Sequence, residues 1–374
     1  MKKVKLGEVT INIDNRRKPL NNLQRSEKSF SKKYPYCGAN NIIDYIDEYI
    51  FDENEEILCI AEDGGNWGKD EECTYVMNEK CWVNNHAHVL KMKTGVDINY
   101  IKLTLDYLDL TSYITGSTRG KLTKSSLDKI EINLPNYRTQ ISISKKIFDI
   151  QKLITKKETQ IQKYNELVKS RFNEMFGDIF DTTFPIYRLE ELCEFIKDGT
   201  HQTPQYTDDR TNGFKFLSSK DVTSGKISWE NIKYITESLH NELYSKISPR
   251  RNDILLAKNG TTGIAALVDC DEIFDIYVSL AILRFYDGNN PTYLLYAINS
   301  DATKWQFESK LKGVGVPNLH LREIRKTKIP LPPLSLQNEF ADFVAQVDKS
   351  QLAIQKSLEE LETLKKSLMQ EYFG

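Results

Sequence analysis

The sequence has none of the features that mark a membrane or secreted protein. No apolar run approaches the roughly 18 residues of a membrane span. The N-terminal stretch MKKVKLGEVTINIDN begins with lysines but contains no apolar core, so it does not have the pattern of a signal peptide. We therefore expect the protein to be cytoplasmic.

Cysteine is sparse and follows no metal-binding pattern. The six cysteines include no C-x-x-C pair. Cys73 and Cys81 lie near His86 and His88 in the chain, but their spacing fits no familiar zinc motif. We therefore expect buried, reduced thiols and no bound metal.

Motifs for cofactor chemistry are also missing. The chain contains no G-x-x-x-x-G-K-[ST] phosphate loop and no Asn-Pro-Pro-aromatic motif of an adenine methyltransferase. The string KGVGVP (312–317) has a G-x-G pattern, but it opens no helix that is followed by an acidic ribose ligand, which favours a simple turn. No catalytic residue and no cofactor are therefore expected in this chain.

Charge is balanced overall but not along the chain. The formal net charge is −2, which argues against a protein coated in basic residues. Residues 117–177, however, carry 13 Lys and Arg against 6 Asp and Glu. A partner with phosphates would therefore be bound by local basic patches.

What the chain does contain is a repeat of half its length. The phrase NEMFG in the middle of the chain recurs as QEYFG at its end, 197 positions later. Carried backwards without gaps, this register pairs Gln140 with Gln337 and continues through a helix, a Leu-Pro turn, a strand and a loop. The protein is therefore predicted to be two copies of one unit, about 1–177 and 178–374.

Each copy ends in a long helical pattern. Apolar residues recur there in heptads, with no Pro or Gly until Gly177 or Gly374, which suit helix C-caps. A helix over residues 143–175 would be about 48 Å long. The two helices are expected to pair along an apolar seam. The predicted seam residues are Ile147, Ile150, Ile154, Ile161, Tyr164, Val168, Val344, Val347, Ile354, Leu358, Leu361 and Leu368.

The two globular parts, about 1–135 and 178–332, have a mixed pattern. EILCIA, HAHVLKMK, DILLAK and YVSLAILRFY are typical of strands, whereas NYIKLTLDYLDL and TYLLYAINSDATKWQFESKL are typical of helices. Since the second unit starts where the first helix ends, the second helix is expected to run back beside the first. The predicted fold is α+β: two mixed α/β domains separated by two long helices that form an antiparallel coiled coil, with an internal pseudo-two-fold repeat.

Taken together, these features resemble the specificity subunit of Type I restriction–modification systems. The resemblance covers essentially the whole chain. Besides the repeat, it rests on KLGEV (5–9) and WVNNHAHVL (82–90), and on TGSTRGKLTKSSLDKIEINLP (115–135) and VPNLHLREIRKTKIPLPPLSLQNEF (316–340), which each feed a long helix. It implies a non-catalytic subunit whose two target-recognition domains each read one half of a bipartite DNA sequence.

The resemblance also implies boundaries and partners. Target-recognition domain 1 would span residues 1–137, helix 1 residues 138–177, target-recognition domain 2 residues 178–334 and helix 2 residues 335–374. The helices would set the spacer and dock two methyltransferase subunits, which bind S-adenosylmethionine and methylate adenine at N6. Two restriction subunits, which use ATP and magnesium, can join such a complex, whereas this chain itself would hold no cofactor.

Gly-containing loops with cationic and amide side chains are the candidates for DNA contact. Cations neutralise phosphates, and Arg, Lys, Asn and Gln also pair with base edges. The candidates in the first unit are Arg16, Arg17, Lys18, Lys32, Lys33, Asn40, Asn66, Trp67, Lys69, Ser117, Thr118, Arg119 and Lys121. Those in the second unit are His201, Gln202, Thr203, Lys220, Lys258, Asn259, Thr261, Thr262, Asn318, His320 and Arg322. The two sets differ, so the two half-sites are expected to differ as well.

Two other classes of function remain as alternatives. A stand-alone DNA-modifying enzyme would need the cofactor motifs that the chain lacks, and methylation by the isolated protein would reveal one. A coiled-coil scaffold that binds only protein would fail to bind any duplex, even with its partner present. The polar, Gly-rich, basic loops in both units favour the DNA-specificity hypothesis.

Overall fold

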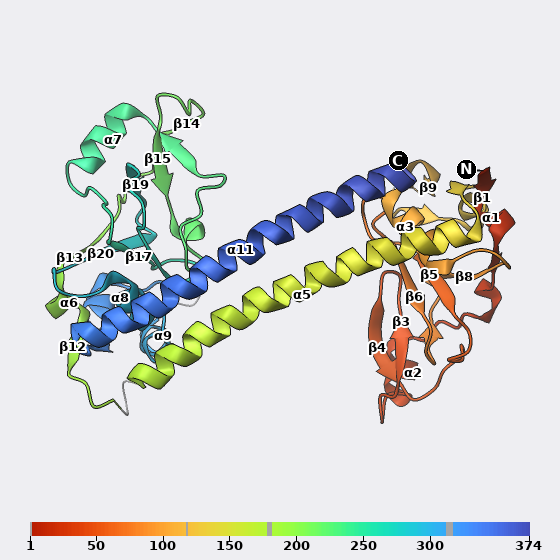
Figure 1. The fold of residues 1–374 in the computed structure, drawn as a ribbon, viewed down its shortest axis with the longest axis horizontal. Helices are drawn as coiled ribbons and strands as arrows, with labels where there is room; N and C mark the ends of the chain where they lie inside the picture. The colour runs from red at the N-terminus through yellow and green to blue at the C-terminus, as the bar shows by residue number, and fades with distance from the viewer. Residues whose placement is uncertain (1, 117–118, 178–181, 312–316) are drawn as a thin grey trace. The chain divides into compact units, whose positions relative to one another are not determined.

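The computed structural model describes residues 2–116, 119–177, 182–311 and 317–374. The chain divides into two compact units, Met1–Thr159 with Ile354–Gly374 (unit 1) and Gln160–Ala353 (unit 2). Two long helices, α5 (Tyr137–Phe176) and α11 (Leu334–Phe373), run through both units, and each contributes one stretch to unit 1 and one to unit 2 (Figure 1). No helix in the described part of the chain is long and apolar enough to cross a bilayer.

Unit 1 is built on two small sheets. Its strands are β1 (Lys2–Lys5), β2 (Thr10–Asn12), β3 (Tyr34–Cys37), β4 (Ile42–Ile46), β5 (Ile57–Ala61), β6 (Thr74–Met77), β7 (Trp82–Val83), β8 (Ala87–Met92), β9 (Ile114–Thr115), β10 (Lys121–Leu122) and β11 (Glu131–Leu134). Its short helices are α1 (Leu6–Val9), α2 (Asn22–Glu27), α3 (Ile98–Tyr107) and α4 (Lys124–Leu127), with 3-10 turns at Asp14–Arg16 and Thr111–Tyr113. The sheets have the strand orders β2-β8-β5-β6 and β4-β3-β7, and β1 pairs with β11 and β9 with β10 as separate ribbons.

Unit 2 is built in the same way. Its strands are β12 (Ile186–Arg188), β13 (Cys193–Asp198), β14 (Tyr206–Thr207), β15 (Phe214–Leu217), β16 (Lys233–Ile235), β17 (Ile254–Ala257), β18 (Ala265–Leu267), β19 (Phe274–Ile276), β20 (Leu280–Phe285) and β21 (Lys328–Pro330). Its short helices are α6 (Leu189–Leu192), α7 (Glu237–Tyr244), α8 (Pro291–Ile298), α9 (Asp301–Glu308) and α10 (Leu321–Lys326), with a 3-10 turn at Ser219–Asp221. The sheets have the orders β13-β20-β17-β18 and β14-β16-β15-β19, and β12 pairs with β21.

The strand pairings of the two units correspond. In the first sheet of each unit all neighbouring strands are antiparallel. In the second sheet one strand has an antiparallel neighbour on one side and a parallel one on the other: β3 lies between β4 and β7, and β15 between β16 and β19. The internal repeat inferred from the sequence register is therefore a repeat of topology.

Two buried glutamines, paired by that register, make the same contacts in both units. Gln140 of α5 accepts the Asp97 N–H (2.8 Å) and donates to the Pro135 carbonyl (2.8 Å). Gln337 of α11 accepts the Asn290 N–H (2.8 Å) and donates to a proline carbonyl (2.9 Å). Each glutamine thereby ties the start of a long helix to the N-cap residue of α3 or α8.

Within each unit the stretches of α5 and α11 lie side by side and antiparallel, as the sequence predicted (Figure 1). As the residue numbers of the contacts on α5 increase, those of their partners on α11 decrease, which is the pattern of antiparallel helices. The pairs are Lys146–Tyr372 and Gln151–Lys365 in unit 1, and Asn165–Gln351 and Arg171–Glu339 in unit 2. Gly177 has φ +67° and donates its N–H to the Asn173 carbonyl (2.9 Å), which is the glycine C-cap expected at the end of α5.

The predicted seam residues divide between two levels of burial. Those that are buried are Ile147, Ile150, Ile154, Val168, Val344, Val347 and Leu358. Those that are half-buried are Ile161, Tyr164, Ile354, Leu361 and Leu368. Both long helices also enter the domain cores, since Ile143 and Phe373 belong to the core of unit 1 and Phe172 and Phe340 to that of unit 2.

One stretch that the sequence predicts as a single helix forms two helices, α8 and α9. The pattern TYLLYAINSDATKWQFESKL was expected to form a single helix, but α8 ends at Ile298 and α9 begins at Asp301. Ser300 is the N-cap of α9, because its side chain accepts the Thr303 N–H. A serine that can satisfy a free N–H group favours a new helix start over continuation of the old one.

Candidate nucleic-acid interface

The turn after β5 brings together several polar side chains of unit 1. Arg119 donates from Nη2 to Asp63 Oδ1 (2.9 Å), and Asn40 donates from Nδ2 to the Gly64 carbonyl (3.1 Å). His86 places Nδ1 at 2.9 Å and 3.0 Å from the two carboxylate oxygens of Asp63. The predicted DNA contacts Asn40 and Arg119 therefore meet at one turn, although 79 positions separate them in the chain.

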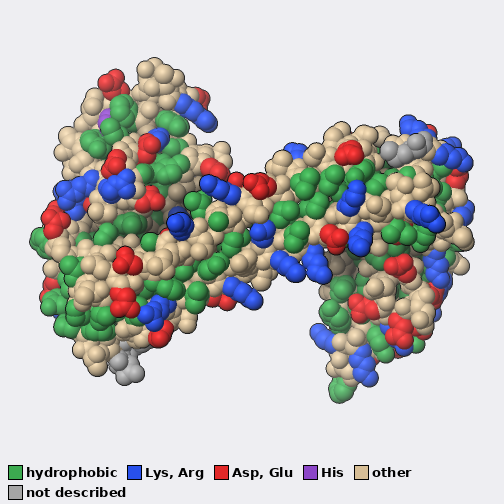
Figure 2. Space-filling model, viewed as in Figure 1, with side chains coloured by type: hydrophobic (Ala, Val, Ile, Leu, Met, Phe, Trp, Pro, Cys, Tyr) green, Lys and Arg blue, Asp and Glu red, His purple; other side chains and the backbone are tan. Residues whose placement is uncertain are grey.

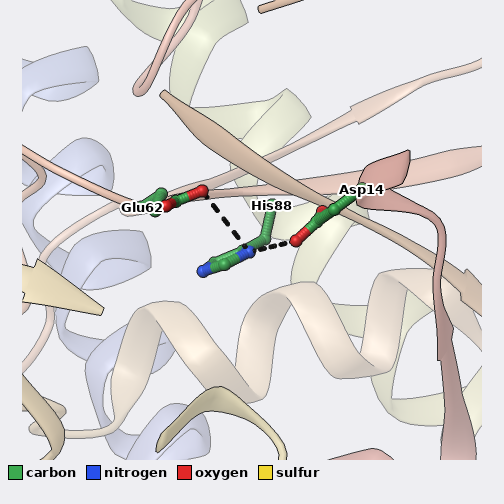
Figure 3. Close-up of side chains that lie close together, drawn as sticks. All are labelled: Asp14, Glu62 and His88. Atoms are coloured by element: carbon green, nitrogen blue, oxygen red, sulfur yellow. Dashed lines mark hydrogen bonds and ion pairs between the residues drawn. The ribbon is translucent and has the colours of Figure 1, made fainter. Parts of the chain in front are cut away.

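Behind this turn lies a buried cluster of opposite charges (Figure 3). His88 places Nδ1 at 2.6 Å from Asp14 Oδ2 and 3.8 Å from Glu62 Oε2. Its Nε2 lies 2.7 Å from the Leu122 carbonyl, and its side chain is only 2% exposed. Arg17 donates to Glu62 (2.6 Å) from the same side of the sheet.

The hydrogen bonds of this cluster favour the charged form of Asp14. Burial alone raises the pKa of Asp14, but hydrogen bonds from His88, the Val89 N–H and Asn12 outweigh it, and the pKa of Asp14 is lowered. An ionised Asp14 and a backbone carbonyl are both hydrogen-bond acceptors, so each ring nitrogen of His88 already faces an acceptor. The three side chains have the donor types of a metal site, but both ring nitrogens of His88 are already engaged within the protein, and the cluster fits an ion-paired group better.

Arg16 and Arg17, both predicted to contact DNA, use their donors within the protein. Arg16 forms a bidentate pair with Glu55 (2.5 Å and 2.9 Å) and donates to the Ile50 carbonyl (2.9 Å). Arg17 is 14% exposed and also donates to the Ala87 carbonyl (2.6 Å). Both guanidinium groups are therefore engaged in holding the domain together.

The remaining candidates of unit 1 occupy several environments. Trp67 lies in the core and donates its indole N–H to the Ala61 carbonyl (3.3 Å). Lys121 pairs with Glu62 (2.9 Å) and Lys32 with Asp44 (3.7 Å). The other exposed candidates are Lys18, Lys33, Asn66 and Lys69. Ser117 and Thr118 lie outside the described residues. That these side chains touch DNA stays a prediction.

Unit 2 has its own cluster at the matching place. Lys258 donates to Asp198 (2.7 Å), and His201 lies 3.1 Å from the same carboxylate. Asn259 and Asn318 form an isolated backbone bridge beside them. Burial raises the pKa of Asp198, but Lys258 and His201 outweigh that effect and lower it. Two predicted DNA contacts, Lys258 and His201, thus meet at one aspartate, and two more, Asn259 and Asn318, pair with each other next to Lys258 in the chain.

Other candidates of unit 2 lie on its surface. Those that are exposed are Gln202, Thr203, Lys220, Thr261, His320 and Arg322, and Thr262 is half-buried. Gln202 and His201 also line a cavity of about 270 Å³ that reaches the buried Asp275. One oxygen of Asp275 has no hydrogen-bond partner in the described structure, while the other lies 2.7 Å from His240 Nδ1.

The backbone shows which residues of the two clusters correspond. Glu62 donates its N–H to His86 and accepts the Leu122 N–H (both 2.8 Å). Lys258 makes the matching bonds with Ser279 (2.9 Å) and Leu319 (2.8 Å). Lys258 of unit 2 therefore stands where Glu62 stands in unit 1.

Sequence reasoning missed the acidic members of these clusters. The search for loops with cationic and polar side chains does not select Asp63 or Asp198, and the sequence pattern raises His86 only as a metal ligand. A carboxylate three residues before a predicted contact histidine, as in Asp198 and His201, was a signal that could have been used. In the view of Figure 2, basic and acidic side chains are interspersed over the surface of both units.

Comparison with known proteins identifies the family. The model of the Type I restriction modification DNA specificity domain matches residues 1–166 and again 182–364. A Haemophilus influenzae protein named as a type I restriction enzyme specificity subunit is 28% identical over 91% of this chain and 85% of its own. The type I restriction enzyme MjaVIII specificity subunit of Methanocaldococcus jannaschii is 25% identical over 90% of this chain and 84% of its own.

Solved structures agree on the fold. The S subunit of a type I restriction–modification system from M. genitalium matches with a TM-score of 0.61 and 14% identity, covering 100% of this chain and 96% of that one. The chain has two specificity domains, two long helices and the strand order repeated in both units. It belongs to the Type I restriction–modification DNA specificity family, whose members are non-catalytic specificity subunits.

Proposed function

We propose that this chain directs DNA methylation by reading a bipartite target, one half with each recognition domain. The observation that carries the proposal is the repeated domain with different side chains at the matching strand end: Glu62 and Arg119 in unit 1, Lys258 and His201 in unit 2. A repeated fold provides equivalent docking, and different polar groups select different bases.

In this proposal the long helices set the distance between the half-sites. Each helix has 40 residues, or about 60 Å, which equals roughly 17 base pairs at ~3.4 Å each. The helices also dock two methyltransferase subunits, which bind S-adenosylmethionine and methylate adenine at N6. Two restriction subunits with ATP and magnesium would complete a nuclease. The chain itself binds DNA and its partners, holds no cofactor and catalyses no step.

Long-read sequencing of DNA from cells that express this chain with a cognate modification subunit tests the proposal. We expect N6-methyladenine in one split, asymmetric motif, and none when either subunit is omitted. Methylation by the isolated chain would instead indicate a stand-alone enzyme. An assembled complex that neither methylates nor binds any duplex would contradict the proposal and favour a protein-only scaffold.

A further inference from the structure

Arg119 differs from Arg16 and Arg17 in how its N–H donors are used. Arg16 and Arg17 each direct several donors to protein oxygens. Among the residues that the structure describes, Arg119 makes one side-chain hydrogen bond, from Nη2 to Asp63, and its side chain is 68% exposed. Most of its five N–H donors therefore face outward in a fixed fork.

The fork is held by groups that lie behind it. Asp63 is only 18% exposed, and His86 contacts both of its oxygens. Gly64 has φ +65°, and a Cβ there would lie 3.4 Å from Arg119 Nη2, so the guanidinium lies directly over this turn. Asn40 in turn binds the Gly64 carbonyl. The orientation of Arg119 is thus set before any ligand arrives.

This arrangement suits a base edge better than a phosphate. A phosphate contact depends on net positive charge, and Asp63 largely cancels the charge of Arg119. A guanine edge instead requires two parallel N–H donors aimed at O6 and N7, and it is the commonest specific target of arginine in DNA. Holding the side chain in advance reduces the entropy lost on binding.

We propose that Arg119, held in place by Asp63, reads a guanine in the half-site recognised by unit 1. The inference rests on the proposed function and adds a base and a residue to it. Asp63 and His86 act as positioning residues. In the 197-residue register of the repeat, Val316 stands where Arg119 stands, so unit 2 has no matching arginine and the effect belongs to one half-site.

Methylation by complexes that carry single substitutions tests the assignment. We expect Arg119→Ala and Arg119→Lys to relax one guanine position of the unit 1 half-site, with a loss of discrimination of roughly tenfold to a hundredfold. The other half-site should stay unchanged. Lys124→Ala, an exposed substitution of equal charge five residues away, should leave the whole motif intact.

Asp63→Asn separates positioning from simple stability. Loss of the carboxylate frees the charge of Arg119, so we expect weaker guanine discrimination together with tighter binding to unrelated duplexes. A merely structural role would weaken binding to all duplexes equally. Assembly with the modification subunit and the melting temperature of each variant serve as folding controls.

Replacing the guanine with 7-deazaguanine tests the contact atom directly, because this base pairs normally but lacks the N7 acceptor. We expect the wild-type complex to lose roughly tenfold in affinity and the Arg119→Ala complex to lose nothing further. Equal losses in both complexes, or an unchanged motif in Arg119→Ala, would overturn the assignment. A wild-type complex without any bipartite motif would refute the proposed function instead.

Discussion

Lys258 of unit 2 and Glu62 of unit 1 occupy the same strand end with opposite charges, and their neighbours change accordingly. In unit 1 two carboxylates, Asp14 and Glu62, surround the buried His88. In unit 2 the single carboxylate Asp198 is paired with Lys258 itself. A buried charge needs a partner, so the two units reach local neutrality by different routes and present different groups at their surfaces.

Acid should weaken unit 1 through this cluster. The pKa values of Asp14 and Glu62 are lowered in the folded protein, since hydrogen bonds from His88 and Arg17 outweigh the effect of burial. A carboxyl with a lowered pKa stabilises the fold above its unfolded value, about 4, and loses that contribution as pH falls through the folded value. Denaturation of wild type and Asp14→Asn between pH 3 and 5.5 should therefore show a stability difference that shrinks toward pH 3.

A pH-independent difference would contradict this account of Asp14. Asparagine carries no charge at any pH, which makes the variant an internal reference.

The paired glutamines offer a matched test of the repeat. Replacing Gln140 or Gln337 with alanine leaves a part-buried N–H group and a proline carbonyl without these partners. Each substitution should lower the free energy of unfolding by about 2–4 kcal/mol, measured by chemical denaturation. Gln162→Ala, on an exposed face of α5, should change it by less than ~0.5 kcal/mol. Similar small effects at all three positions would refute the structural role.

At the scale of elements, the long helices are anchored by their ends. Phe172 of α5 is 5% exposed and packs against Phe176, Tyr293 and Phe340, with ring centroids 5.0, 5.8 and 5.3 Å away. Nearer the middle of the helix pair, Gln351 of α11 donates a hydrogen bond to Asn165 of α5 (2.7 Å). The equivalent position in the first copy of the repeat is the apolar Ile154, so the contact at Gln351 is more polar. The aromatic contacts of α5 therefore lie where it meets the core of unit 2.

Truncation of one aromatic anchor tests this. Phe172→Ala would open a cavity among aromatic rings and should destabilise unit 2 by about 3–5 kcal/mol in chemical denaturation. Leu167→Ala, at a residue 48% exposed on the same helix, should cost less than ~1 kcal/mol. Equal effects would show that burial in the aromatic cluster does not determine helix anchoring.

Much of the fold could be predicted because the repeat contains two versions of the same element pattern, and each supports the assignment of the other. The strands EILCIA and DILLAK are β5 and β17, and both long helices follow from heptads. The break between α8 and α9 at Ser300 was not predicted, because the apolar periodicity continues across it. The start of α9 is instead determined by a single capping side chain.

The site was harder to predict, and the reason is distance along the chain. From the local sequence Arg16 is predicted to contact DNA, but in the structure its guanidinium group pairs with Glu55, which lies 39 positions away in the chain. Asp63 looks unsuitable until His86 and Arg119 converge on it. Which charges are free depends on tertiary pairing, and one sequence without structure does not show those pairs.

At the scale of the whole molecule, two copies of one topology carry unlike polar clusters. Under the proposed function, a substitution at one strand end should therefore alter one half of the recognition sequence and leave the other unchanged. The helices, which pair with each other in both units, are independent of those strand ends. Target bases and target spacing should consequently be separable by mutation.

Inserting four residues into both helices, after Thr159 and after Ala353, tests that separation. Four residues add about 6 Å and rotate a helix ~40° beyond one full turn, which the apolar seam tolerates as a stutter. We expect the methylated half-sites to stay the same and the gap between them to lengthen by about one or two base pairs of ~3.4 Å. Two-residue insertions at the same places would turn the seam ~200° away, and assembly should fail. An unchanged gap in an assembled four-residue variant would show that the helices do not measure the spacer.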